Sequence, residues 1–275
     1  MKVRFALVFM GGLVLLIARW ANHAQNYPET NYPVYSGNLT AEDLEPTGEL
    51  TVVSYNIRYS LNIDQAVLEL KEFQDQREVD IILLQEMDEV GVEHIARALN
   101  FNYVYIPAAV EPRYRQNTGN AILSRWPITA SAKLILPHNG LSSGMNRTAT
   151  KAIIQIDDAD ILVYSIHAET KFTLPSFREN QYRAILEDVD REAEFVIVGG
   201  DFNSVTSADI TRIEEMYRRA GFMRATRHSG HTVEKFKMRV TADHIFSKGF
   251  NVQQDGKFDE ATASDHLPIW ARLSF

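Results

Sequence analysis

Residues 195–204 read FVIVGGDFNS, an apolar run that ends in two glycines and then in the polar side chains of Asp201 and Asn203. Four consecutive apolar residues before the glycines are typical of a strand that is buried on both faces. Asp201 and Asn203 stand two positions apart, so in extended backbone both side chains point to the same face. The stretch therefore predicts a buried strand that presents a carboxylate and an amide at its end.

Other apolar runs along the chain also end in an acid, an amide or an imidazole. The runs that begin at residues 52, 81 and 161 lead to Asn56, Glu86 and His167, while Asp265 and His266 directly precede the last apolar run. Strand ends along one sheet edge are where a rigid scaffold can present a convergent site. A single residue of this kind can instead serve a turn, but the repetition indicates one polar site.

Apolar runs and amphipathic stretches alternate through residues 50–275. Strands are expected at residues 50–56, 79–84, 103–106, 121–124, 149–156, 161–166, 195–198, 244–246 and 267–273, and helices at residues 62–76, 89–99, 176–190 and 207–220. Gly221 is well placed to end the last of these helices. Many strands and fewer helices predict an α/β fold in which two sheets pack together with helices outside.

The polar residues at these strand ends suit the hydrolysis of a phosphate ester. Such an ester repels hydroxide, so a cation must neutralise an oxygen, a base must position water and an acid must help the leaving oxygen depart. Glu86 and Asp265 offer hard oxygen ligands, which suit Mg²⁺, Mn²⁺ or Ca²⁺. The polar pair within residues 195–204 can orient water and donate to phosphate oxygen, and Asp243 is a candidate to fix the tautomer of His266.

A series of short motifs follows the same order as the strands. They are SYNIR (54–58), LLQEMD (83–88), GNAILSR (119–125), YSIHAE (164–169), GGDFNS (199–204), ADHIF (242–246) and SDHLP (264–268). Together they resemble the endonuclease/exonuclease/phosphatase superfamily, a group that includes pancreatic-type deoxyribonucleases, abasic-site endonucleases, neutral sphingomyelinases and inositol polyphosphate 5-phosphatases. The resemblance covers about residues 50–275. It implies a four-layered α/β-sandwich of two packed mixed sheets with outer helices, with the site at one edge of both sheets.

The resemblance also implies which residues hold the metal. Asn56 and Glu86 resemble the metal-side pair, with Glu86 as the principal ligand, and Asp265 resembles the second metal-side carboxylate. The implied cofactor is Mg²⁺, with Mn²⁺ as the alternative. Arg147 stands where relatives often carry an arginine that contacts the substrate phosphate, and a solvated arginine at the start of a strand is its alternative interpretation.

Five further residues take catalytic roles by the same resemblance. His167 resembles the histidine that contacts the phosphate or the leaving group. Asp201 and Asn203 resemble the pair that orients water and stabilises the oxyanion. His266, with Asp243 behind it, resembles the Asp–His general base, although which member of this set acts as the base is left open.

The composition limits the classes of function. Of the 275 residues, 45% are apolar, which is enough for the core of one domain of about 200–250 residues. A net charge of −8 does not attract nucleic acid or anionic lipid as a whole, but a bound cation can reverse the field locally. Because the chain has no cysteine, disulfides, thiolate nucleophiles and zinc–cysteine sites are excluded.

The first 21 residues predict a signal peptide or an N-terminal membrane anchor. Residues 5–18 are uncharged, Lys2 and Arg4 precede them and Arg19 follows, which is the pattern of an export signal. The run is short for a membrane span of about 20 residues and lacks a clean cleavage motif, so both alternatives stay open, and a buried helix is a third. Residues 22–49 predict a linker, and residues 50–275 form the domain, expected to be secreted, periplasmic or membrane-anchored outside the cytoplasm.

These observations predict a metal-dependent hydrolase of phosphate mono- or diesters. The phosphorylated substrate is a phospholipid or glycosylphosphatidylinositol-like lipid, a sugar phosphate or a nucleic acid, and no obligate protein partner is evident. A secreted nuclease is the main alternative, for which Arg113, Tyr114 and Arg115 supply a small basic and aromatic cluster. A binding module that has lost catalysis is the second alternative, and it is disfavoured because every acid, amide and imidazole position is filled.

Overall fold

The structure is a computed structural model of the chain, and it describes residues 23–40, 48–141, 143–170, 173–235 and 238–275. The expected signal or anchor at residues 1–21 lies outside the described residues. Every strand and helix expected from residues 50–275 is present within them.

In the described residues, the first sheet has eight strands in the order β1-β5-β6-β4-β3-β16-β15, with β2 paired to β5. Their bounds are β1 (Gln25–Asn26), β2 (Tyr35–Gly37), β3 (Glu49–Asn56), β4 (Ile81–Met87), β5 (Asn102–Glu111), β6 (Gln116–Ser124), β15 (Asn251–Lys257) and β16 (Ile269–Ser274). The sheet is mixed, because β3 and β4 are parallel whereas β4 and β6 are antiparallel.

The second sheet has six strands in the described residues, in the order β11-β14-β10-β9-β8-β7. Their bounds are β7 (Ile128–Asn139), β8 (Asn146–Ile156), β9 (Ala159–His167), β10 (Phe195–Asp201), β11 (Met223–Arg224) and β14 (Asp243–Lys248). This sheet is also mixed, since β9 and β10 are parallel and their neighbours β8 and β14 are antiparallel to them. A small hairpin, β12 (Val233–Lys235) and β13 (Met238–Val240), pairs separately.

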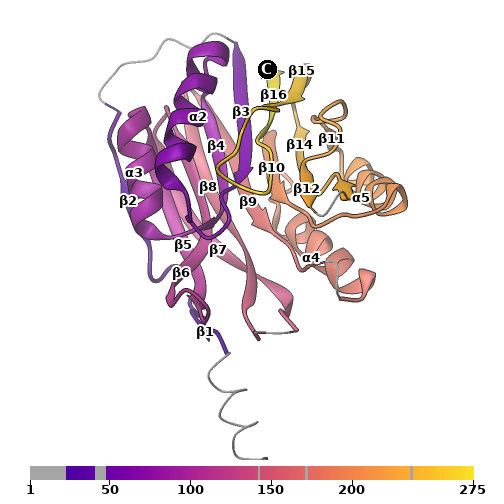
Figure 1. Cartoon of the computed structure of the whole chain (residues 1–275). Coiled ribbons are helices and arrows are strands. Elements are labelled where there is room, and N and C mark those ends of the chain that lie inside the picture. The colour runs from indigo at the N-terminus through magenta and orange to yellow at the C-terminus, as the bar shows by residue number, and fades with distance from the viewer. Residues whose placement is uncertain (1–22, 41–47, 142, 171–172, 236–237) are drawn as a thin grey trace, which may run out of the picture.

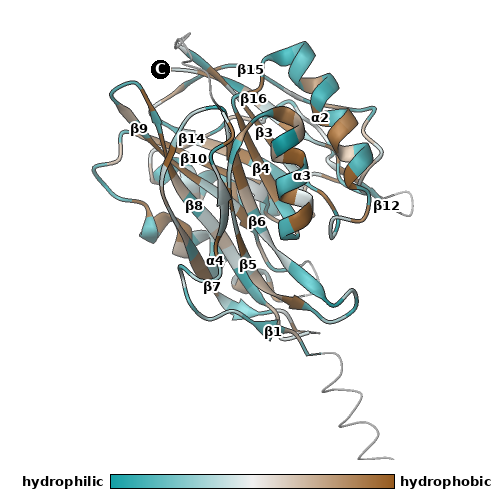
Figure 2. Ribbon diagram, turned by 90° about the vertical axis from the view of Figure 1, so that its left-hand side faces the viewer, coloured by the Kyte–Doolittle hydropathy of each residue, from teal (hydrophilic) through white to brown (hydrophobic). Residues whose placement is uncertain are grey.

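The two sheets pack face to face, and helices cover their outer faces (Figure 1). Helices α2 (Ile63–Arg77) and α3 (Glu89–Leu99) pack on the first sheet, and α4 (Pro175–Asp188) and α5 (Ser207–Arg219) lie against the second. One apolar cluster fills each of the three spaces between the four layers. Figure 2 shows the apolar strands inside and polar residues on the outer side of α2 and α3. The predicted four-layered α/β-sandwich is confirmed.

Local sequence explains where the helices begin and end. Asp88 caps α3 by accepting a hydrogen bond from the backbone N–H of Gly91 at 2.8 Å, and Thr206 and Asp209 cap α5 reciprocally. Gly221 follows α5 with a φ of 85°, a left-handed conformation that a glycine adopts without strain.

The expected linker at residues 22–49 is wrong for its described part. Strands β1 and β2 both pair antiparallel with β5 and so extend the first sheet. The buried Lys133 side chain also holds this stretch against β5, because its Nζ donates to the carbonyls of Tyr27 at 2.9 Å and Pro107 at 2.8 Å. These contacts are made mainly by backbone groups, which leave no periodic pattern of apolar residues in the sequence.

None of the helices in the described residues is long and apolar enough to cross a membrane.

Candidate active site

Strand register in the second sheet brings three of the predicted residues abreast. Asp201, at the end of β10, pairs with His167 at the end of β9 on one side. On its other side it pairs with Asp243, the first residue of β14. Because neighbouring strands lie about 4.8 Å apart, the three side chains share one edge of the sheet, which we call the catalytic edge.

The two glycines before Asp201 permit this close packing. A Cβ atom on Gly199 would stand 2.5 Å from a side-chain carbon of Leu83 in the opposite sheet. Gly200 has a φ of 143°, and a Cβ there would meet the carbonyl oxygen of Ile166 at 2.1 Å. Only glycine fits both positions without a shift of the backbone, so the GGD motif is required by the geometry that presents Asp201.

The first sheet contributes Asn56 and Glu86 to the same edge. Asn56 is the last residue of β3 and pairs with Gln85 of β4. Glu86 follows in a left-handed backbone conformation with a φ of 56°, where the β4–β6 register shifts. Strain of this kind costs of order 1 kcal/mol and gathers at functional sites. Asn56 Nδ2 lies 3.4 Å from Glu86 Oε1 and 3.2 Å from Asp201 Oδ2, so one amide joins the carboxylates of two sheets.

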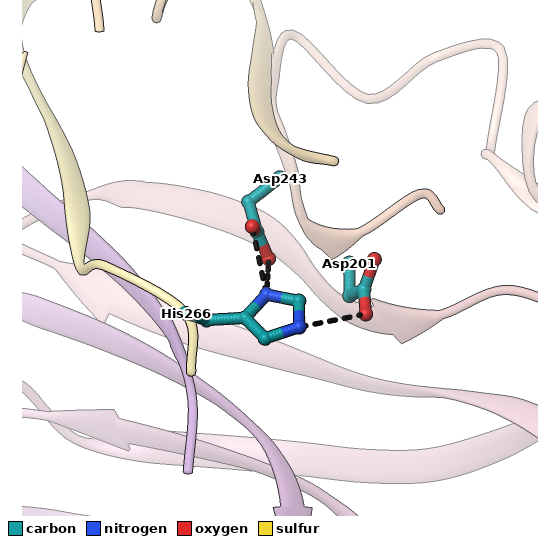
Figure 3. Close-up of side chains that lie close together, drawn as sticks. All are labelled: Asp201, Asp243 and His266. Atoms are coloured by element: carbon teal, nitrogen blue, oxygen red, sulfur yellow. Dashed lines mark hydrogen bonds and ion pairs between the residues drawn. The ribbon is translucent and has the colours of Figure 1, made fainter. Parts of the chain in front are cut away.

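His266 lies between two aspartates (Figure 3). Its Nδ1 is 2.9 Å from Asp243 Oδ2, and its Nε2 is 3.8 Å from Asp201 Oδ2. Asp243 is buried, and its Oδ2 also accepts a hydrogen bond from Thr232 Oγ1 at 2.5 Å. Because a carboxylate can only accept, Asp243 holds a proton on Nδ1 of His266 and leaves Nε2 directed toward Asp201.

The charges at the catalytic edge are strongly perturbed. Burial raises the pKa of Asp201 and of Glu86, and the charge of His266 opposes both changes. Burial alone would lower the pKa of His266, but the charges of Asp243 and Asp201 raise it above its ordinary value. Burial, followed by the charges of Arg147 and His266, lowers the pKa of His167 and keeps that imidazole neutral. Perturbed groups gathered in one place are typical of a functional site.

Arg147 lies on the opposite side of the cluster from His266. Its Nη1 is 3.3 Å from His167 Nε2, and its Nε and Nη2 each lie 3.5 Å from an oxygen of Glu169. Both side chains of this ion pair are almost completely buried, so the alternative of a solvated arginine is wrong. His167 Nε2 is also 3.7 Å from both Glu86 Oε1 and Asp201 Oδ2. His167 therefore lies beside one carboxylate from each sheet, Glu86 of the first and Asp201 of the second.

Asp265 and Asn203 complete the set predicted from sequence. Asp265 Oδ1 lies 3.9 Å from Nε of Arg58, and the charge of Asp265 contributes to the raised pKa of Glu86. Asn203 donates its backbone N–H to Asp201 Oδ1 at 2.8 Å and its side-chain Nδ2 to the carbonyl of Ala168 at 3.1 Å. Its amide thus braces the turn after β10 in this structure.

The donor set fits a hard divalent cation. Glu86, Asp201 and Asp265 offer carboxylate oxygens, and burial makes two of these carboxylates costly to keep charged without a cation. Asp201, Asp243 and His266 also place their ligand atoms within 4.8 Å of one another. Asp243, however, already accepts hydrogen bonds from His266 and Thr232. The oxygen-rich side with Glu86 is therefore the better place for such an ion.

Two contributors were missed in the sequence. Glu169 lies in the YSIHAE motif, two residues after His167, and that spacing is the signal that could have placed it beside Arg147. Thr232 had no such signal, because it reaches Asp243 only through the fold of the loop before β12.

The sequence model of the Endonuclease/Exonuclease/phosphatase family matches residues 53–266. No curated protein has a sequence that matches this chain.

Solved structures of the same fold include three informative examples. A family protein from Leptotrichia buccalis C-1013-b is 18% identical, with a TM-score of 0.67 over 82% of this chain and 100% of that chain. D. rerio TDP2 complexed with a single-strand DNA product is 17% identical, with a TM-score of 0.65 over 82% of this chain and 99% of that one. ANGEL2, a 2',3'-cyclic phosphatase in complex with adenosine-2',3'-vanadate, is 15% identical, with a TM-score of 0.64 over 82% and 95%. At these identities the likeness shows the fold alone.

Proposed function

The chain belongs to the endonuclease/exonuclease/phosphatase family, and we propose that it is a divalent-metal-dependent hydrolase of phosphate esters that acts outside the cytoplasm. Members of this family hydrolyse phosphoester bonds. The observation that carries the proposal is the convergence of Glu86, Asp201 and the Asp243–His266 pair on one edge of two sheets. The basic and apolar residues 1–21 support the location.

The metal side of the site consists of Glu86 and Asp265. A cation held there, Mg²⁺ or Mn²⁺, supplies neutralisation of a nonbridging phosphate oxygen. Asn56 orients the carboxylate of Glu86, because its Nδ2 donates to Glu86 Oε1. The Oδ1 of Asn56 accepts the backbone N–H of Arg58 at 3.0 Å, which fixes the amide. Arg147, fixed by Glu169, adds a second positive charge for the phosphate.

The imidazole side moves the proton. Asp243 fixes the tautomer of His266, so Nε2 is the atom that takes a proton from water when the ring is neutral and returns one to the leaving oxygen when it is charged. Asp201, across from Nε2, orients the attacking water. Neutral His167 accepts a hydrogen bond from Arg147 at Nε2, because a guanidinium only donates, and so holds that arginine beside the phosphate or leaving group.

A second candidate, a nuclease, has one specific observation in its favour. The rings of Tyr59 and Tyr114 stand 5.1 Å apart, and the guanidinium of Arg113 lies over Tyr114 at 5.1 Å. Tyr59 lies three residues after Asn56, the last residue of β3, so the aromatic stack lies in a loop of the catalytic edge. Aromatic rings next to cations suit the stacking of unpaired nucleobases.

The test of the proposed activity is hydrolysis by the purified full chain. We expect hydrolysis of bis-p-nitrophenyl phosphate with Mg²⁺ or Mn²⁺, loss of activity on chelation, and recovery when the metal returns. Glu86→Gln should abolish the metal response, whereas Glu93→Gln, on the exposed side of α3, should keep it. Undiminished activity after exhaustive chelation would show that the metal assignment is wrong. Parallel assays with single-stranded DNA decide between the two candidates.

The location has its own test, because the chain has no cysteine. A cysteine placed at the exposed Asp158 provides a single thiol on the domain. We expect a membrane-impermeant maleimide to label Asp158→Cys in intact cells. Labelling only after lysis would place the domain inside and refute this part of the proposal.

A further inference from the structure

The N-terminal stretch joins the domain at its catalytic edge. Strand β5 runs toward that edge, and β1 pairs antiparallel to it, with Gln25 opposite Val110. Residue numbers in β1 therefore decrease toward the catalytic edge. His23 and Ala24 lie beyond β1, where the backbone N–H of Ala24 donates to the carbonyl of Ser143 at 2.8 Å, in the loop that leads to Arg147.

The level of this junction follows from the register of the first sheet. Val110 pairs with Asn117, and Gly119 pairs with Met87, the neighbour of Glu86. Gln25 of β1 therefore lies two residues, or about 7 Å, beyond the level of Met87. Figure 1 shows β1 at the lower end of the domain and the C-terminus at the upper end. The first described residues, His23 and Ala24, therefore lie on the catalytic side.

Exposed leucines stand in three loops of the same edge. Leu61 is 49% exposed, Leu141 is 70% exposed and Leu174 is 62% exposed. Their loops follow β3, precede β8 and follow β9, so each loop adjoins a strand that carries Asn56, Arg147 or His167. Exposed apolar side chains gathered around a site are a feature of surfaces that bind a partner or a membrane.

Exposed arginines accompany the leucines. Arg58 follows Asn56, and Arg113 and Arg115 occupy the tip of the β5–β6 hairpin. Tyr59 and Tyr114 bring the two elements together through their ring contact. We call the three leucines and these three arginines the catalytic rim. Apolar side chains with cations beside them match the boundary between lipid chains and phosphate head groups.

We propose that the catalytic rim docks on a lipid bilayer, so that the site takes the phosphate ester of a lipid head group. The inference rests on the proposed function for the reaction, and on the rim and the junction of the N-terminal stretch for the orientation. The opposite end of the same strands carries the exposed Asp157, Asp158 and Asp160 and no rim of this kind among its described residues. That end faces away from the membrane.

The orientation is tested by fluorescence quenching in the full chain. Single cysteines at Leu61, Leu141 and Leu174 are labelled with an environment-sensitive dye, and the protein is reconstituted into vesicles of phosphatidylcholine and phosphatidylglycerol that contain doxyl-labelled lipid. Leu68→Cys is the matched control, since Leu68 is 63% exposed but lies on α2, and Asp158→Cys marks the far end. We expect quenching at the three rim positions and none at the two controls. Equal quenching at all five, or none at the rim, overturns the proposal.

Activity gives an independent readout. Leu141→Asp and Leu174→Asp remove apolar contacts with lipid without touching the catalytic cluster, and each should lower hydrolysis of a lipid in vesicles about tenfold. Hydrolysis of soluble bis-p-nitrophenyl phosphate should stay unchanged. Equal losses on both substrates, or none on the lipid, contradict docking.

The failures of the two proposals are distinguishable. Rim quenching without hydrolysis of any ester refutes the proposed function and leaves the orientation standing. Hydrolysis of the soluble ester without quenching at the rim supports the proposed function and refutes the orientation on a bilayer. Rim dyes shielded by single-stranded DNA and not by vesicles would assign the rim to nucleic acid and overturn the lipid assignment.

Discussion

The two ends of the sandwich are both acidic but are built in opposite ways. The end away from the catalytic edge has a groove of about 960 Å³ on the outer face of the second sheet. Its carboxylates are Asp157, Asp158, Asp160, Asp188, Asp190, Glu192 and Glu194. At the catalytic edge, the space beside Arg147, His167 and Asn120 is only about 10 Å³.

The difference shows that converging polar groups, and not the size of a hollow, indicate chemistry. The carboxylates of the groove are mostly exposed, and Lys151 there already pairs with Asp188 at 2.8 Å. At the catalytic edge, Asp201 and Asp243 are buried and share one imidazole. Removal from water strengthens every charge interaction among such groups. Mutations at the two ends should therefore differ sharply in effect.

The largest effect is expected from the Asp–His pair. His266→Ala removes the atom that moves the proton and should lower kcat by about 10²–10⁴. Asp243→Asn should act in the same direction, and the double variant should fall far short of the product of the two single effects, because the residues act as a unit. Steady-state kinetics on bis-p-nitrophenyl phosphate measures this. His94→Ala, at an exposed position of α3, is the control.

Multiplicative losses in that cycle would mean that the two residues act separately. Near-normal kcat in His266→Ala would remove this residue from the catalytic set and direct attention to His167.

The second prediction concerns the effect of acid on the stability of the fold at the catalytic end. His244 is fully buried next to Asp243, its Nε2 lies 2.8 Å from Ser204 Oγ, and its Nδ1 has no hydrogen-bond partner. Ser204 donates to the carbonyl of Thr241, so the hydroxyl accepts from Nε2–H of a neutral ring. Burial lowers the pKa of His244 from 6.5 to about 3.

The sign of the pH effect follows directly. Below pH 6.5 the unfolded chain binds a proton at His244, whereas the imidazole of the folded chain stays neutral until the pH approaches 3. The contribution of neutral His244 to the free energy of unfolding is therefore complete above pH 6.5 and is lost as the pH falls toward 3. The loss is about 5 kcal/mol at most. Denaturant unfolding at a series of pH values should give a shallower dependence for His244→Gln than for the unmodified chain. Identical slopes would be inconsistent with a buried neutral imidazole.

The third prediction concerns Arg147. Arg147→Lys keeps the charge but loses the two-pronged contact with Glu169 and the approach to His167. A charge-assisted hydrogen bond is worth about 1.5–3 kcal/mol, so kcat/KM should fall about tenfold to a hundredfold. Thermal unfolding should show that the variant stays folded. An unchanged kcat/KM would leave Arg147 as a structural residue only.

The smallest effect is expected in the groove. Asp158 and Asp160 are exposed, and exposed substitutions usually change stability by no more than about 0.5 kcal/mol. The double variant Asp158→Asn and Asp160→Asn should keep kcat within about twofold and leave unfolding unchanged. A large fall in activity would break the comparison and make the groove part of the catalytic apparatus.

The sequence predicted the interior of the fold well because its strands are continuous apolar runs. Strand β10 and the polar residues after it illustrate this, since the run FVIVGG specifies both burial and the position of Asp201. The edge strands β7 and β15 were missed. Strand β15 is polar and held by backbone pairing with β16, and in β7 the buried Lys133 interrupts the apolar pattern.

The candidate site shows the same division. Residues at strand ends, such as Glu86 and His167, were found because a short pattern precedes each one. Thr232 was not, because its role depends on a distance across the fold that no local pattern encodes. Glu169 was overlooked, although its position two residues after His167 was a signal for its place beside Arg147. The predicted roles themselves, including metal binding, stay predictions for the experiments above.

The side chain of Asn26 determines where a break in the chain can be tolerated. Its Nδ2 donates to the carbonyl of Gly144 at 2.9 Å, and its Oδ1 accepts the backbone N–H of Asn146 at 2.8 Å. The Asn26 amide thereby joins β1 to Asn146, the residue that precedes Arg147. A break in the chain after Asn26 would release the loop that leads to Arg147 from this amide, whereas a break before it would keep both hydrogen bonds.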